Sequence, residues 1–208
     1  SAGIVDSGNV AVAGDVTLTT DAGNGVINMG TLPQSAGDLI LVTNGNGAAT
    51  VVNNAAIDFG TSNVGGALDV TASAGTITQN GGALTVAGTS AFTTSTNDQA
   101  ITLSNTTNAL TGAVAFTTGG TTGNVVIDNG TTGLDLAAST SSGTLTASGG
   151  ASAGIVDSGN VAVAGNVTLT TDAGNGVINM GTLQQSAGDL ILVTNGNGAA
   201  TVVNNAAI

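Results

Sequence analysis

The chain has 208 residues and contains no Lys, Arg, His, Cys, Trp or Tyr, so its 12 acidic residues give it a net charge of −12. Without cations it has no electrostatic footprint for nucleic acid, and its charge repels phosphate backbones and anionic membranes. The absence of His and Cys excludes the usual zinc, haem and iron–sulfur sites, as well as Ser-His-Asp and Cys-His nucleophiles.

Short segments of alternating apolar and polar residues follow one another along the chain, and we expect each of them to form a β-strand. The clearest are residues 15–20, 38–43, 67–72, 89–94, 113–118, 133–138 and 166–171. Further short strands are expected at residues 10–13, 26–29, 49–53, 76–79, 83–86, 100–103 and 124–128. Gly, Asn, Asp and Ser separate these segments, and such residues favour turns because Gly and Asn tolerate positive φ. No segment has helical periodicity.

A long repeat organises the chain. Residues 1–57 recur as residues 152–208 with two changes, since Asn166 replaces Asp15 and Gln184 replaces Pro33. The period is therefore 151 residues. We interpret residues 1–151 as one full repeat and residues 152–208 as the start of a second one, within a single continuous structure that is a window of a longer array.

A shorter, degenerate repeat lies within this period. The central apolar residues of the seven clearest segments are Leu18, Leu41, Val70, Phe92, Phe116, Leu136 and Leu169, at steps of 23, 29, 22, 24, 20 and 33 residues. Strands of four to six residues with Gly/Asn corners, recurring every 20–25 residues or so, predict an all-β fold, a parallel β-helix or β-solenoid. We expect right-handed coils, the default for parallel strands, and hydrogen-bonded ladders of stacked Asn and Thr.

Several of these segments resemble the repeats of giant bacterial surface proteins. They are the runs at residues 65–79, 81–89, 100–105 and 110–117. The resemblance covers essentially the whole chain and is to filamentous-haemagglutinin-like exoproteins and autotransporter adhesins. It implies a right-handed β-helix that is secreted to the bacterial cell surface and serves adhesion, aggregation or biofilm structure.

The Asp residues are the main candidates for a chemical site. Clustered carboxylates could bind calcium, but no segment matches the G-G-x-G-x-D-x-U-x nonapeptide of calcium-binding solenoids, and Asn166 replaces Asp15 in the second copy. Asp69 and Asp135 lie in similar Leu-Asp contexts and could form a hydrolytic pair, but the chain has no cationic groups and few aromatic ones to hold a sugar. We therefore predict no catalytic, cofactor-binding or metal-binding residue, with calcium as the alternative.

The sequence thus predicts a structural protein rather than an enzyme. We expect an extracellular rod that stacks end to end on neighbouring repeats and contacts cell-surface glycans, without inserting into a membrane. The alternative is a β-helix that binds or cleaves polysaccharide. Thr-x-Thr triplets such as Thr17–Thr19 raise the alternative of a flat ice-binding array, but the segments at residues 39–43 and 134–136 interrupt such an array. The β-propensity of Thr explains the triplets without it.

Overall fold

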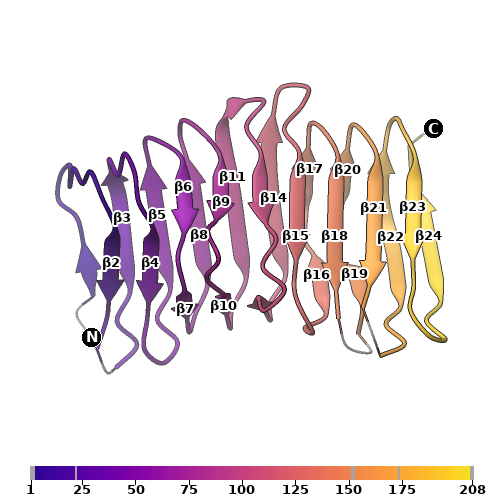
Figure 1. Ribbon diagram of the computed structural model, residues 1–208, viewed down its shortest axis with the longest axis horizontal. Coiled ribbons are helices and arrows are strands. Elements are labelled where there is room, and N and C mark those ends of the chain that lie inside the picture. Colours follow the sequence, from indigo (N-terminus) through magenta and orange to yellow (C-terminus); the bar gives the residue numbers. More distant parts are fainter. Residues whose placement is uncertain (1–2, 22, 151–152, 173, 207–208) are drawn as a thin grey trace.

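The strands of this protein form two parallel sheets that face each other. The computed structural model describes residues 3–21, 23–150, 153–172 and 174–206, and every regular element within them is a β-strand. Each sheet contains 12 strands, and all pairings are parallel. The strands stack in about nine turns (Figure 1), so the predicted β-solenoid is confirmed.

The chain passes back and forth between the two sheets and leaves one or two consecutive strands in a sheet before it crosses to the other. The first sheet consists of β1 (Ile4–Val5), β3 (Ile27–Leu32), β5 (Ala49–Asn53), β8 (Leu68–Ala72), β11 (Ser90–Asn97), β14 (Val114–Gly119), β16 (Leu134–Leu136), β17 (Ser139–Ser141), β19 (Ile155–Asp157), β20 (Val161–Val163), β22 (Ile178–Gln185) and β24 (Ala200–Asn204). The second sheet consists of β2 (Val16–Thr19), β4 (Leu39–Val42), β6 (Ile57–Phe59), β7 (Ser62–Val64), β9 (Ile77–Gln79), β10 (Leu84–Val86), β12 (Ile101–Leu103), β13 (Ala109–Leu110), β15 (Val125–Asp128), β18 (Leu145–Gly149), β21 (Val167–Thr171) and β23 (Leu190–Val193).

The length of each coil follows from the register between neighbouring strands. Ala49 pairs with Leu68 of the following coil, and further along the chain Ser90 pairs with Val114 of the following coil. The spacing of these partners along the chain is close to the short repeat expected from the sequence. The two longest steps of that repeat, from Leu41 to Val70 and from Leu136 to Leu169, join residues of different sheets. Leu41 and Leu169 belong to the second sheet, whereas Val70 and Leu136 belong to the first.

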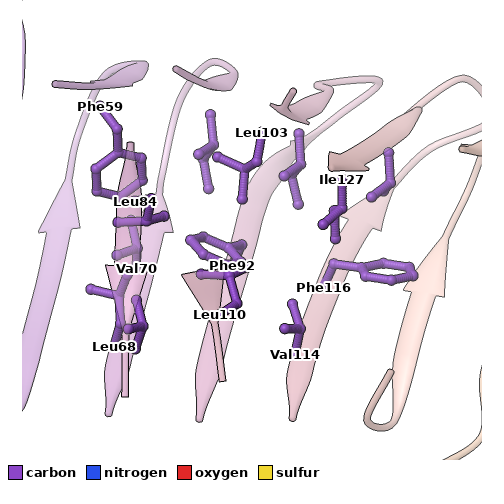
Figure 2. Packing of buried hydrophobic residues seen from close by; sticks show 14 of the residues in the cluster. Phe59, Leu68, Val70, Leu84, Phe92, Leu103, Leu110, Val114, Phe116 and Ile127 are labelled. Carbon is purple, nitrogen blue, oxygen red and sulfur yellow. The ribbon is translucent and has the colours of Figure 1, made fainter. Parts of the chain in front are cut away.

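The core occupies the space between the sheets. Strand β8 illustrates the pattern, since Leu68, Val70 and Ala72 are buried while Asp69 is exposed. Phe59 and Phe92 meet edge to face with their ring centroids 6.3 Å apart, and Figure 2 shows both rings among the aliphatic side chains of the interior. Alternation at a period of two therefore buries one face of nearly every strand.

Glycines are stacked at one corner of successive coils. The N–H of Gly66 donates to the carbonyl of Gly47 at 2.8 Å, and that of Gly88 donates to Gly66 at 3.0 Å. A Cβ atom on Gly88 would lie 2.6 Å from the carbonyl carbon of Gly66, and one on Gly112 would lie 2.5 Å from the carbonyl oxygen of Gly88. This corner requires glycine because consecutive coils approach closely there.

The strand predicted at residues 10–13 is wrong in its extent. Of these four residues only Val12 forms a bridge, to Gln34, whereas the equivalent residues of the second copy form β20, which pairs with β22. Pro33 accounts for part of the difference because it has no N–H to donate to a ladder. Strand β3 accordingly ends at Leu32, while β22 continues through Gln184 to Gln185.

The two copies of the long repeat lie in the same two sheets. Leu134 of the first copy pairs with Ile155 of the second, and Leu145 pairs with Val167. The pairing across this junction is the same parallel ladder as elsewhere in the molecule. None of the described segments is a helix with the length and apolar character needed to cross a membrane.

Candidate functional site

The two Asp residues considered as a hydrolytic pair lie far apart. Asp69 is on β8 and Asp135 is on β16, with β11 and β14 between these strands in the first sheet. Three steps between parallel strands amount to about 14 Å. A glycosidase pair needs carboxyl groups within about 5–10 Å. The structure therefore does not bring these two carboxylates together for such a mechanism.

The other Asp residues are also dispersed. In the part of the chain that the structure describes, no three acidic side chains gather as a metal ion would require. Several of them instead accept hydrogen bonds from the next coil. One Asp6 carboxylate oxygen accepts from the N–H of Gly30 at 3.1 Å, and the other accepts from the N–H and hydroxyl of Thr31 at 2.7 and 2.8 Å. The Thr31 hydroxyl and N–H lower the pKa of Asp6 by stabilising its charged form.

The same link recurs at Asp157, the equivalent residue of the second copy. Its Oδ1 accepts from the N–H of Gly181 at 2.7 Å, and its Oδ2 accepts from the N–H of Thr182 at 2.7 Å. Both copies therefore retain a carboxylate that joins one coil to the next. This is a structural role for an Asp that the sequence also offered as a calcium ligand.

Asp98 makes a third link of this kind, at a turn. Its backbone has a φ of 63°, a conformation that Asp tolerates better than most residues. Its Oδ1 accepts from the N–H groups of Thr121 and Thr122 at 2.7 and 2.8 Å. These two N–H groups lower the pKa of Asp98.

Buried threonines close the corners of several coils. The hydroxyl of Thr43 donates to the carbonyl of Gly47 at 2.6 Å and accepts from the N–H of Gly65, in the next coil, at 2.9 Å. Three other threonines bond to a carbonyl slightly further along the chain and accept an N–H of the next coil: Thr20, Thr118 and Thr171. The expected Thr ladder is thus made of hydroxyl-to-backbone bonds.

Buried amides have the same function. Asn53 is fully buried, and its side chain accepts from the N–H of Gln34 at 2.9 Å and donates to the carbonyl of Gln34 at 3.0 Å. Asn129 bonds to both backbone groups of Leu110 in the same way. Stacked Asn side chains were expected from the sequence, but these inward amides were not identified. Their signal is a polar residue at an inward position of an otherwise alternating strand.

Outward-facing threonines form one regular row on the first sheet. Thr71 pairs with Thr93, Thr93 with Thr117, and Thr117 with Thr140. The row thus crosses four coils at the same register. These residues are outside the Thr-x-Thr triplets that the sequence suggested as an ice-binding array.

The two ends of the stack expose strands that are covered elsewhere in the molecule. At the C-terminal end, Leu190, Leu192 and Val202 are only partly buried. Their equivalents in the first copy are Leu39, Leu41 and Val51, and each of these is 0% exposed. The sequences are identical, so the exposure arises because no further coil covers these side chains in the described part of the chain.

The N-terminal end shows the same contrast. Val10 is 42% exposed, whereas its equivalent Val161 is 0% exposed because a preceding coil covers it. In the part of the chain that the structure describes, both ends of the stack therefore have apolar side chains that are only partly covered.

Comparison with known proteins gives one match. Residues 45–117, which extend from the corner before β5 into β14, match the family model described as "Repeats of unknown function (DUF5649)". No curated protein and no solved structure matches the chain. The matched repeats and the stacked coils fit a repeat-based β-helix protein.

Proposed function

We propose that this protein is a structural rod segment of an extracellular bacterial adhesin or fibre, and that it acts as a spacer rather than as an enzyme. The observation that carries this proposal is the junction between the two copies of the repeat. Leu134–Leu136 of the first copy pairs in parallel with Ile155–Asp157 of the second. An added repeat therefore extends the same pair of sheets instead of forming a separate domain.

The chemistry of the surface supports a mechanical role. The Asp side chains of residues 6, 98 and 157 are engaged in bonds between coils, and the chain has no cation or nucleophilic His or Cys with which to build a reactive centre. Hydrogen bonds from coil to coil and a continuous apolar core resist bending and stretching. Such a rod holds whatever is attached to its ends at a fixed separation.

The length of the rod provides the test. Each period of 151 residues contributes seven coils in the first sheet, from the level of β1 to that of β19, or about 34 Å at roughly 4.8 Å per coil. Proteins with one, two and three periods should be measured by electron microscopy and small-angle X-ray scattering. We expect rods of constant width whose length rises by the same increment with each added period. Compact particles, or beads joined by flexible links, would overturn the proposal.

A further inference from the structure

The chain contains eight Asn-Gly pairs, and the structure distinguishes one of them from the rest. An asparagine followed by glycine can modify itself, because the small residue lets the next backbone nitrogen approach the side-chain carbonyl carbon. The pairs begin at Asn24, Asn44, Asn46, Asn80, Asn129, Asn175, Asn195 and Asn197. Since all eight share the same dipeptide, the fold determines which of them can react.

Three of these asparagines use their side chains to hold a neighbouring coil. Asn24 Oδ1 accepts from the N–H of Asn46 at 2.8 Å, and Asn175 makes the equivalent bond in the second copy. Asn129 is 0% exposed, its Oδ1 accepts from the N–H of Leu110 at 2.7 Å, and its Nδ2 donates to the carbonyl of Leu110 at 3.0 Å. None of these three side chains can turn toward the following nitrogen without breaking such bonds.

The glycine is restrained in four other pairs. The N–H of Gly47 donates to the carbonyl of Asn44 at 3.1 Å, so this nitrogen is engaged within its own turn. Gly45 lies so close to the preceding coil that a Cβ atom on it would overlap Asn24 Oδ1. The second copy repeats both restraints, at Gly198 and Gly196.

The pair Asn80–Gly81 has neither kind of restraint. Asn80 is exposed, and in the part of the chain that the structure describes neither its side chain nor the N–H of Gly81 has a hydrogen-bond partner. Gly81 has a φ of 80°, and a Cβ atom on it would meet no atom within 4 Å. The side-chain amide and the N–H can therefore approach each other without losing a bond.

The length of the loop explains why this pair is open. Four residues separate β9 from β10, whereas two separate β6 from β7 in the preceding coil. The longer loop therefore projects beyond the backbone on which it stacks. Gly82 returns to the stack, because a Cβ atom on it would overlap the backbone of Thr61. Asn80 and Gly81 form the projecting part.

We propose that Asn80 is a site of spontaneous deamidation in the folded protein. The Gly81 nitrogen attacks Cγ of Asn80 and forms a new N–Cγ bond, while the Cγ–Nδ2 bond breaks and Nδ2 leaves as ammonia with the proton lost from Gly81. Water then opens the resulting succinimide at either carbonyl and leaves aspartate or isoaspartate. Each event adds one negative charge to the −12 of the chain, and isoaspartate also lengthens the backbone by one methylene group.

The neighbouring contacts should keep the coil in place after this reaction. The side chains of Gln79 and Asn108 exchange two hydrogen bonds, at 2.7 and 3.0 Å, and neither bond involves the reacting groups. Strands β9 and β10 keep their parallel partners on both sides. Deamidation therefore changes the charge and shape of one loop in each 151-residue period without unfolding the rod, wherever the rod is located.

Peptide mapping tests the proposal. The folded protein is incubated in mildly alkaline buffer, which promotes loss of the Gly81 amide proton, and is digested with chymotrypsin because it has no Lys or Arg for trypsin. Mass spectrometry then measures amide loss at every pair. We expect Asn80 to react at least about tenfold faster than the other seven, which react only after local opening of the fold. Reaction of Asn24 or Asn129 as fast as that of Asn80 would overturn the proposal.

The same measurement in denaturant separates the effect of the fold from that of the dipeptide. All eight pairs should react at comparable rates in the unfolded protein. If Asn80 remained the fastest by the same factor after unfolding, its local sequence rather than the open loop would be the cause, and the structural explanation would be refuted.

Matched substitutions locate the site. Asn80→Gln removes the group that closes the five-membered ring and should abolish the fast release of ammonia from the folded protein. Asn46→Gln alters another exposed Asn-Gly pair and should leave this release unchanged, once circular dichroism shows that both variants are folded. Fast release that persists in Asn80→Gln, or that is lost equally in both variants, would exclude Asn80 as the site.

Discussion

Asp15 and Asn166 accept the same hydrogen bond in the two copies of the repeat. Asp15 Oδ1 accepts from the N–H of Asp38 at 3.0 Å, and Asn166 Oδ1 accepts from the N–H of Asp189 at 3.0 Å. The change between the copies therefore removes a negative charge and retains the acceptor. The role of this position is to hold the next coil, and an amide oxygen performs it as well as a carboxylate.

This equivalence predicts the outcome of two substitutions at Asp15. Asp15→Asn should leave the free energy of unfolding unchanged within about 0.5 kcal/mol, because it reproduces the second copy. Asp15→Ala should lower it by up to about 1 kcal/mol, since the bond is lost. Urea unfolding followed by circular dichroism measures both. A loss of equal size in the two variants would show that the charge, rather than the acceptor, matters.

Pro33 predicts a difference in stability between the copies. Pro33→Gln should extend β3 as in β22 and raise the free energy of unfolding by about 1 kcal/mol, because it restores an N–H to the ladder. Hydrogen exchange at residues 10–12 and 31–35 should slow. The reverse substitution, Gln184→Pro, is the matched control and should shorten β22 and destabilise the protein. Unchanged exchange in Pro33→Gln would contradict this explanation.

The glycines stacked at one corner of successive coils predict that the effect of a Gly→Ala substitution on stability depends strongly on its position. Gly88→Ala should destabilise the protein by about 1–3 kcal/mol, because the new Cβ would overlap the backbone of the preceding coil. A Cβ on Gly8 would meet no atom of the described residues within 4 Å, so Gly8→Ala should change stability by less than about 0.5 kcal/mol. Thermal unfolding compares the two variants, and similar effects would exclude close approach as the cause.

The lowered pKa values of Asp6 and Asp98 predict acid sensitivity. A carboxyl group whose pKa is lower in the folded state stabilises the fold above its ordinary value of 3.8, and this contribution disappears as the pH falls through the lower folded value. Stability should therefore decline from about pH 4 downward. In Asp98→Asn, which keeps the Oδ1 acceptor but cannot ionise, the decline should be smaller, as measured by unfolding at pH 5, 4, 3 and 2. An identical decline would contradict a contribution from this group.

Removal of divalent cations should leave the coils folded. The core consists of apolar side chains such as Leu68 and Val70, and the Asp residues that link coils bond to N–H and hydroxyl groups. Circular dichroism should therefore show the same β signal before and after addition of a chelator, whereas light scattering should fall if cations bridge neighbouring rods. Loss of the β signal would show that a cation is part of the fold.

Most of the strand positions could be predicted from the sequence because the pattern that defines them is local. Alternation at a period of two in segments such as residues 67–72 and 113–118 identifies a strand with one buried face, and the confirmed strands β8 and β14 lie close to those limits. The long repeat and the absence of Lys, Arg, His and Cys side chains could also be read directly from the sequence. Together these observations determined the solenoid and excluded most reactive sites.

The tertiary structure decided how the strands are assigned to sheets. Leu41 and Val70 are both central apolar residues of alternating segments, yet they lie in different sheets. The reason is that the lengths of the corners determine which strands meet, and those lengths vary from coil to coil. The inward amide of Asn53 and the linking carboxylate of Asp98 also depend on partners that are a whole coil away along the chain. Only the stacked coils bring such groups together, because residues that lie about 20 positions apart in sequence become neighbours along the axis of the stack.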